Sequence, residues 1–340
     1  AASAMPKGAA PLVPGLKPSG RAELVLSPID GMEIGTVAFA TADEARKAVT
    51  AGQAGFRKWS RMPVDDRAGI LEKAADLLES NRGPLMALLA REAGKTLDDG
   101  VAEIREAADF CRYYAEEARR KFGAAQTMPG PTGETNRLHH RGRGVFVAIS
   151  PWNFPLAIFL GQVTAALAAG NAVVAKPAEQ TPLTADLAVR LLHQAGVPKD
   201  ALLYVPGDGS VGAALTADPR IAGVVFTGST ETARVINRTL AAKDGPIVPL
   251  IAETGGLNAM IVDATALPEQ VADDVVVSAF RSAGQRCSAL RILYLQEEIA
   301  GPVLAMIEGA TRELRLGDPA LPETDIGPII DNSQRQMLLD

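Results

Sequence analysis

The sequence predicts an α/β fold: a helical region, then a doubly wound parallel sheet, then a second α/β segment. Two observations support this. Between residues 145 and 262, near-continuous apolar runs alternate with helix-length segments, which is typical of parallel strands buried on both faces. Before them, residues 41–122 carry apolar side chains at helical spacing. The chain has 340 residues, enough for two domains with their own cores.

The first part of the chain divides into a linker, helices and an arm. Residues 1–21 are rich in Pro, Ala and Gly, lack the charged and apolar regions of a signal peptide, and are interpreted as a linker. Thr41 and Glu44 have the spacing of a capping box, which predicts the start of a helix. Residues 129–144 are polar and contain Pro and Gly, which predicts an exposed hairpin or arm.

One of the two cysteines lies in the helical region. Cys111 shares an apolar helix face with Ile104 and Ala115, so it is interpreted as a small packed hydrophobe. Glu103 and Phe110 lie on another face of the same helix. That face either lines a cavity or is simply solvated.

Five apolar runs predict the parallel strands. They cover residues 145–149, 172–175, 202–205, 223–226 and 247–251. A further strand is expected near Met260, then a helix over residues 268–282 and a loop that carries Cys287. Another helix is expected to begin near Asn332.

Composition excludes several classes of function. A net charge of -6 gives no positive field for nucleic acid, and the longest apolar stretch, residues 156–169, is too short to span a membrane and predicts a buried helix. Two cysteines exclude a disulfide framework, which favours a cytoplasmic setting. Three histidines are too few for a histidine metal cage, so we expect no metal site.

Polar clusters follow the predicted strands, where ligands of doubly wound sheets bind. The members of these clusters are Ser150, Pro151, Trp152 and Asn153; Lys176 and Glu179; Gly209; Thr227, Gly228 and Ser229; and Glu253, Thr254 and Gly255. Gly228 and Ser229 precede a predicted helix whose N-terminus could hold a pyrophosphate, although the third glycine of the strict fingerprint is replaced by Ala233. A plain strand-to-helix turn explains the same residues.

Lys176 and Glu179 could bind ribose hydroxyls, and a strand-capping ion pair is the alternative. Because a carboxylate repels a 2′-phosphate, NAD is preferred over NADP.

Three residues could perform covalent chemistry. Cys287 is the nucleophile candidate, since a thiol is intrinsically reactive and the charge of Arg286 would favour the thiolate. Glu253 ends an apolar strand, where partial desolvation would raise its pKa toward that of a general base. Asn153 offers an amide donor to an oxyanion. Each residue also has a purely structural explanation: Cys287 as an inert loop thiol, Glu253 as an N-cap or turn residue, and Asn153 as a turn-forming residue.

Taken together, six strings in order resemble the aldehyde dehydrogenase superfamily. They are Gly94-Lys95-Thr96, Pro151-Trp152-Asn153-Phe154-Pro155, Lys176-Pro177-Ala178-Glu179, Phe226-Thr227-Gly228-Ser229, Glu253-Thr254-Gly255-Gly256 and Gly284-Gln285-Arg286-Cys287. Thr254 and the run Cys287-Ser288-Ala289-Leu290-Arg291 resemble the L-glutamate γ-semialdehyde (1-pyrroline-5-carboxylate) dehydrogenase branch, especially the dehydrogenase half of bacterial proline utilization A. Relatives continue beyond the point where this chain ends.

The resemblance implies roles for the candidate residues. Cys287 would be the nucleophile, Asn153 would complete the oxyanion hole, and Glu253 would activate the deacylating water. Lys176 and Glu179 would hold the adenosine ribose of NAD, and Ser229 and its neighbours its pyrophosphate. The substrate would be contacted by Glu103, Phe154, Arg286 and Ser288, with Ser288 and Glu103 meeting its α-carboxylate and α-amine.

The resemblance also implies an organisation for the whole chain. A Rossmann-type NAD-binding domain would comprise residues 22–128 and 145–252, residues 129–144 would form an oligomerisation arm, and residues 253–340 would begin the catalytic domain. A homo-oligomer, a small-molecule aldehyde substrate and an upstream proline dehydrogenase module are the expected partners. The alternatives are another aldehyde, acyl transfer to coenzyme A, or a non-catalytic scaffold domain.

Overall fold

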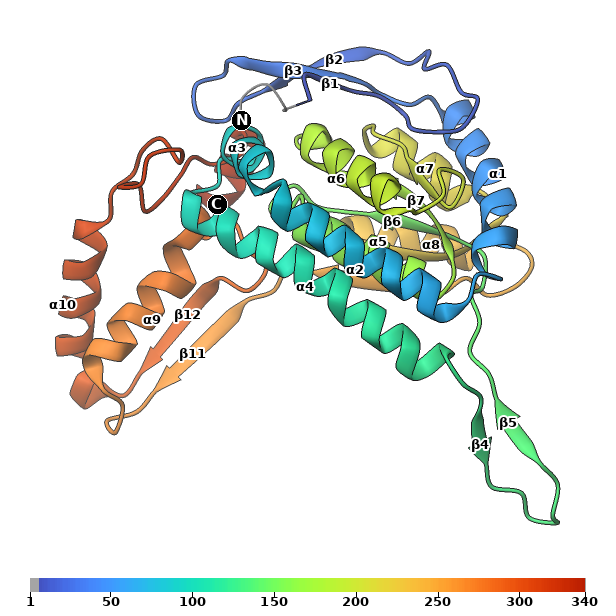
Figure 1. Ribbon diagram of the computed structural model, residues 1–340. Helices are drawn as coiled ribbons and strands as arrows, with labels where there is room; N and C mark the ends of the chain where they lie inside the picture. Colours follow the sequence, from blue (N-terminus) through green and yellow to red (C-terminus); the bar gives the residue numbers. More distant parts are fainter. Residues whose placement is uncertain (1–5, 340) are drawn as a thin grey trace.

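The computed structural model describes residues 6–339 and contains a five-stranded parallel sheet covered by helices, a smaller α/β unit and two accessory sheets (Figure 1). The strands are β1 Gly8–Ala9, β2 Ala22–Leu26, β3 Glu33–Ala38, β4 Gln126–Met128, β5 Asn136–Leu138, β6 Val145–Ile149, β7 Ala172–Lys176, β8 Leu202–Tyr204, β9 Ile221–Gly228, β10 Leu250–Thr254, β11 Asn258–Val262 and β12 Leu290–Leu295. The helices are α1 Ala42–Trp59, α2 Val64–Ser80, α3 Arg82–Ala93, α4 Leu97–Phe122, α5 Ala157–Ala168, α6 Pro182–Ala195, α7 Gly209–Ala217, α8 Thr230–Ala241, α9 Pro268–Phe280, α10 Glu297–Glu313 and α11 Asn332–Leu339, with a 3₁₀ turn η2 at Arg281–Gly284.

The central sheet has the predicted doubly wound arrangement. Its strands are all parallel in the order β10-β9-β6-β7-β8, so the chain moves outward from β6 to β8 and then returns to the other side of β6. Alternate residues of each strand enter two cores. Val147 and Val174 pack into the core shared with α1, α7 and α8, whereas Ala148 and Ala175 pack into the core shared with α5 and α6.

The strand predictions are confirmed except at the edge of the sheet. The strand expected over residues 247–251 is β10, which spans Leu250–Thr254 and begins three residues later. Pro249 explains the shift, because proline has no N–H to donate to a strand ladder. The result places Glu253 inside an edge strand.

The predicted helical region is confirmed. Thr41 and Glu44 form the capping box at the start of α1, with the Thr41 side chain accepting from the Glu44 N–H. Gly94 ends α3 with a φ of 65°, a conformation that glycine adopts without steric cost. The apolar stretch over residues 156–169 forms α5, which is almost entirely buried. None of the helices in residues 6–339 has the length and apolar character to cross a bilayer.

The interpretation of residues 1–21 as a linker is wrong for its described part; residues 1–5 lie outside the described residues. β1 pairs in parallel with β3, and Leu12 bridges to Tyr204 at the free edge of β8. Ala9 and Val13 are buried in the two cores. The segment therefore belongs to the fold, because an otherwise exposed sheet edge gives it backbone partners.

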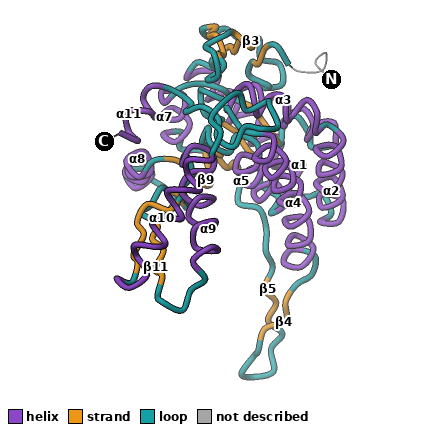
Figure 2. Tube along the Cα trace, turned by 90° about the vertical axis from the view of Figure 1, so that its left-hand side faces the viewer, coloured by secondary structure: helices purple, strands orange, loops and turns teal. Residues whose placement is uncertain are grey.

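The smaller unit follows the central sheet. Parallel strands β11 and β12 pack against α9 and α10 through a core that includes Val262, Val271 and Val303. The expected helix over residues 268–282 is α9 followed by η2. Figures 1 and 2 show this unit beside the central sheet, and show the β4–β5 hairpin projecting from the body as the exposed arm that the sequence predicts.

Candidate functional site

The carboxyl edge of β6 and β9 is the topological switch point of the sheet, where open α/β sheets bind ligands. Ser150 follows β6 directly, and Thr227 lies at the end of β9. Gln162 of α5 connects them. Its Oε1 accepts from Ser150 Oγ at 3.1 Å, and its Nε2 donates to Thr227 Oγ1 at 2.9 Å. This buried amide links the carboxyl ends of β6 and β9, and sequence reasoning missed it.

The turn after β9 has the predicted form. Ser229 is the N-cap of α8 and accepts the Thr232 N–H at 3.2 Å, so the exposed Ser229 lies directly over the helix N-terminus. A Cβ on Gly228 would approach the Phe226 ring to 2.6 Å, so this position has room only for glycine. Ala233 is buried, with its methyl group in the core beneath the turn.

The cluster after β7 contains a buried lysine. Lys176 Nζ donates to the Pro177 carbonyl at 2.9 Å and lies 3.9 Å from the exposed Glu179 carboxylate. Burial lowers the pKa of Lys176, while Glu179 and Asp208 act in the opposite direction. Gly209 is exposed at the first position of α7. An ammonium group carries three donors, so Lys176 has capacity for ligand hydroxyls.

The loop that carries Cys287 meets the switch point through Asn153. Asn153 Nδ2 donates to the Gln285 carbonyl at 2.9 Å, across 132 residues of sequence. Asn258 of β11 holds the other side of the loop, with Nδ2 donating to the Cys287 carbonyl at 2.6 Å and the Ala289 carbonyl at 2.9 Å. Cys287 and Ser288 are both exposed. The main chain on both sides of Cys287 is therefore held while its side chain is accessible.

Two expectations about this loop and its surroundings are corrected. Arg286 does not extend toward a substrate, because its Nη2 donates to the carbonyls of Val277 and Ser278 at the end of α9; burial lowers the pKa of this guanidinium. Glu253 is exposed, so the desolvation expected of it is absent. The reason is its place on β10, the edge strand of the sheet, where Thr254 is half-buried and Gly255 exposed.

The expected substrate contact of Glu103 is also contradicted. Its side chain is fully buried, Oε2 lies 2.8 Å from Lys95 Nζ, and Oε1 accepts the backbone N–H groups of Leu156 at 2.8 Å and Ala157 at 3.2 Å. Lys95 also lies 3.9 Å from the centre of the half-buried Phe154 ring. Glu103 is thus an anchor between α4 and the start of α5, with no exposed oxygen for a substrate amine.

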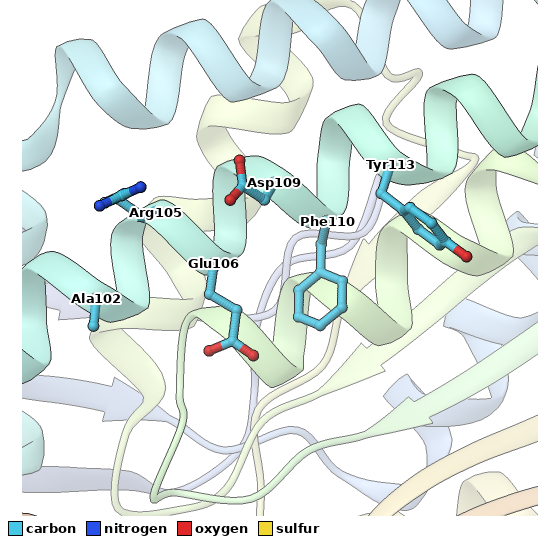
Figure 3. Close-up of a pocket in the computed structure, with 6 residues that line it drawn as sticks. All are labelled: Ala102, Arg105, Glu106, Asp109, Phe110 and Tyr113. Carbon is cyan, nitrogen blue, oxygen red and sulfur yellow. The ribbon is translucent and has the colours of Figure 1, made fainter.

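Glu106, one turn further along α4, is accessible instead. It lines an open pocket of about 650 Å³ together with Phe110 and Tyr113. Figure 3 shows Glu106 and Phe110 extending from the same side of α4. Partial burial of the carboxylate and the nearby Glu103 raise the pKa of Glu106, against a lowering by Lys95. Glu103 and Glu106 both lie at helical spacing from Phe110. The sequence alone therefore could not show which of the two carboxylates is accessible.

Cys111 and the grouping of metal-ligating side chains are the last features that carry sequence-based expectations. Cys111 is fully buried, and burial raises its pKa to about 12, which confirms it as a packed hydrophobe. Within residues 6–339, no three His, Cys, Asp or Glu side chains are grouped so as to hold a metal ion.

The chain is similar in sequence to two groups of known proteins. The sequence is 51% identical over 322 residues to the bifunctional protein PutA of Klebsiella aerogenes, covering 93% of this chain and 24% of that protein. It is 38% identical over 311 residues to a 1-pyrroline-5-carboxylate dehydrogenase of Anoxybacillus flavithermus, covering 90% and 60% of the two chains. The chain therefore spans about a quarter of its PutA relatives.

Solved structures give the same relationship. Proline utilization A from Bradyrhizobium japonicum superposes with a TM-score of 0.87 at 69% identity, over 88% of this chain and 31% of the other. A 1-pyrroline-5-carboxylate dehydrogenase from Thermus with bound NAD superposes with a TM-score of 0.94 at 34% identity, over 99% and 66%. The sequence pattern of the aldehyde dehydrogenase family matches residues 17–340, and the chain belongs to this family.

Proposed function

We propose that this chain takes part in the NAD-dependent oxidation of L-glutamate γ-semialdehyde to L-glutamate, with Cys287 as the nucleophile. The observation that carries the proposal is the 2.9 Å hydrogen bond between Asn153 Nδ2 and the Gln285 carbonyl. It joins the loop of an accessible thiol to the switch point of a dinucleotide-type sheet. Family membership and the names of the relatives support the same activity.

The first step uses the thiolate and two donors. The Cys287 sulfur attacks the aldehyde carbon, a C–S bond forms, and the carbonyl oxygen becomes an oxyanion. An amide Nδ2 carries two hydrogens. One of those on Asn153 is engaged by Gln285, and the other is available to the oxyanion together with the Cys287 N–H. One such donor is typically worth about 2.7–4 kcal/mol in rate.

The second step is the oxidation, for which NAD, when bound, would supply the acceptor of the hydride. The C–H bond breaks with its electron pair, the oxyanion collapses to a carbonyl, and Cys287 is left as a thioester. Water then attacks the thioester, its proton passes to the Glu253 carboxylate, and the C–S bond breaks to release the acid and the thiolate. Because Glu253 is exposed on the edge strand β10, water has free access to its carboxylate.

The residues at the switch point fit NAD. The buried Lys176 and the exposed Glu179 lie 3.9 Å apart, and together they present a donor and an acceptor to ribose hydroxyls. The N-terminus of α8, capped by Ser229, offers backbone N–H groups and a positive dipole end to a pyrophosphate. We assign to the same cofactor site the residues at the carboxyl ends of the strands: Ser150, Pro151 and Trp152 after β6, Gly209 after β8, Thr227 and Gly228 at the end of β9, and Thr254 and Gly255 at the end of β10.

We assign the polar ends of the substrate to two residues. Ser288 is exposed next to Cys287 and would donate to the α-carboxylate. Glu106, in place of Glu103, would receive the α-ammonium, because its carboxylate faces the pocket on α4. Phe154, half-buried next to Asn153, would contact the carbon chain.

The wider organisation is also a proposal. PutA relatives are named bifunctional, and the chain spans about a quarter of them, which supports a proline dehydrogenase module in the same protein. The exposed β4–β5 hairpin carries Met128 and Leu138 on its surface, which supports a role for this arm in a homo-oligomer.

A panel of aldehydes tests the activity. Purified protein carrying this sequence is supplied with NAD and L-glutamate γ-semialdehyde or simple aliphatic aldehydes, and NADH formation is followed by absorbance. We expect the semialdehyde to be preferred, Cys287→Ala to form no NADH, and the core variant Cys111→Ala to stay active. NADH formation by Cys287→Ala would overturn the role of this thiol. If NADH formation required coenzyme A, the acyl acceptor would be coenzyme A and not water.

A further inference from the structure

The turn before Cys287 has an unusual backbone. Ser282, Ala283 and Gly284 are three consecutive residues with positive φ, at 56°, 54° and 68°. Gly284 adopts this conformation freely, but Ser282 and Ala283 carry a Cβ that disfavours it. Ser282 and Ala283 are the two non-glycine residues with positive φ among residues 6–339. Such strain persists only where the surroundings hold it, and it concentrates at functional sites.

One buried carboxylate contacts the first strained residue, Ser282, and the residue before it. Asp99 Oδ2 accepts from Ser282 Oγ at 2.6 Å, and Asp99 Oδ1 accepts from Arg281 Nε. The Asp99 side chain is 7% exposed and that of Arg281 is 37% exposed, so the carboxylate is the buried member of this charge-assisted contact. Asp99 lies in the first turn of α4, 182 residues away in sequence. The contact therefore ties the smaller unit to the helices of the central sheet.

The conformation of the turn determines where the next residues lie. Arg291 Nη2 donates to the Gly284 carbonyl at 2.6 Å, and Gln285 Nε2 donates to the Ser282 carbonyl at 3.1 Å. The reversed chain then presents the Gln285 carbonyl to Asn153. Cys287 follows two residues later, so a relaxed turn would move its sulfur relative to the Asn153 amide.

We infer that Asp99 is a positioning residue: its contacts with Arg281 and Ser282 hold the left-handed turn at residues 282–284 and thereby place Cys287 against Asn153. The inference deepens the proposed function and depends on the role of Cys287 given there. Its physical basis is the requirement that reacting groups be held near attack geometry, since a displacement of about 1 Å can cost about a hundredfold in rate.

A purely helical role for Asp99 is the competing explanation. An acidic residue in the first turn of a helix stabilises it through the helix dipole, and Asp99 lies in that turn. Asp98 occupies the same turn and is exposed. Asp98→Asn is therefore the matched control, because it removes the same charge from the helix without touching the strained turn.

Hydrogen exchange followed by mass spectrometry tests the positioning directly. In Asp99→Asn we expect the amides of residues 281–289 to exchange about tenfold faster or more, while the peptides of α9 and β11 keep their rates. Asp98→Asn should leave residues 281–289 unchanged. Arg281→Gln removes the contact from the other side and should reproduce the effect of Asp99→Asn. Unchanged exchange in both Asp99→Asn and Arg281→Gln would overturn the inference.

Kinetics and a rescue variant complete the test. Asp99→Asn should lower kcat between about tenfold and a hundredfold with the KM for NAD unchanged. Adding Ala283→Gly, which adopts a positive φ at no cost, should restore both slow exchange and kcat in part. Restored exchange without any gain in kcat would also overturn the inference. If the wild-type protein formed no NADH, the proposed function would fail, and the exchange measurements would still decide whether Asp99 holds the turn.

Discussion

Replacing Gln162 with Leu tests whether a buried amide fixes the switch point. Gln162 makes three hydrogen bonds: it accepts from Ser150 Oγ at 3.1 Å and donates to Thr227 Oγ1 at 2.9 Å and to the Ile149 carbonyl at 3.3 Å. Leu has a similar size and cannot make these bonds. The substitution therefore removes the polar link between β6 and β9 with little change in packing volume.

The magnitude follows from the burial of each partner. Ser150 is 5% exposed, so its orphaned hydroxyl costs about 2 kcal/mol. Thr227 and Ile149 are half-buried, so the Thr227 hydroxyl and the Ile149 carbonyl can bind water and their lost bonds together cost about 1 kcal/mol. The added apolar burial of Leu offsets about 1 kcal/mol. We expect the free energy of unfolding to fall by about 2 kcal/mol and the Kd for NAD to rise between about threefold and tenfold.

Urea unfolding followed by tryptophan fluorescence measures the stability, and Trp152 lies beside the perturbed edge. Ser150→Ala and the double variant complete a mutant cycle. Because the two side chains share a bond, the double variant should lose about 1 kcal/mol less than the sum of the single variants. Gln194→Leu, an exposed position on α6, is the control for the change of residue type. Additive losses, or a Gln162→Leu protein as stable as wild type, would refute this reasoning.

Three further predictions concern carboxylates. Glu253→Gln should keep the first burst of NADH in rapid mixing while steady turnover slows, and loss of the burst would place Glu253 before hydride transfer. Glu106→Gln should raise the KM for the semialdehyde but not for aliphatic aldehydes. Glu103→Gln should instead lower the free energy of unfolding by about 3 kcal/mol, because it leaves the buried Lys95 unpaired. Equal effects of the two variants on the KM for the semialdehyde would contradict a substrate role for Glu106 and a structural role for Glu103. Burial raises the pKa of Glu92 from 4.5 to about 7, so its proton stabilises the folded protein fully below about pH 4.5, and this stabilisation is lost as the pH rises through 7. The difference in unfolding free energy between wild type and Glu92→Gln should therefore fall by about 3 kcal/mol over this range in urea titrations, and a flat difference would show that Glu92 is charged throughout.

The sequence predicted the parts of the fold that depend on local pattern. The predicted strand Val145–Ile149 has the same first and last residues as β6, and the capping box of Thr41 and Glu44 starts α1 as expected. These features depend on the period of apolar residues and on contacts three residues apart. The interpretation of residues 6–21 as part of a linker failed because their Pro-rich composition does not reveal the open edge of β8 to which Leu12 bonds.

For the same reason, the strand ends around the candidate site could be predicted from the sequence, whereas the contacts of individual side chains could not. The strand ends that flank the crevice can be read from the sequence, since parallel strands bring their carboxyl ends to one edge. The direction of a helical side chain toward a pocket cannot be read in this way. Glu103 and Glu106 are three residues apart on α4. Only the position of the start of α5 shows that Glu103 accepts hydrogen bonds from the N–H groups of Leu156 and Ala157.

The geometry of the candidate site depends on contacts between residues that are remote in sequence. Asn153 reaches Gln285 across 132 residues, and Asp99 reaches Arg281 across 182. The first contact comes from the loop after β6 and the second from helix α4, so both join the unit built on the central sheet to the segment that precedes the thiol. An isolated hydrogen bond contributes only about 1 kcal/mol to stability, so selection for folding alone gives little reason to place charged and amide groups at this junction. Accurate relative placement of the thiol and the amide gives such a reason, because the rate of thiol attack depends far more steeply on position than stability does.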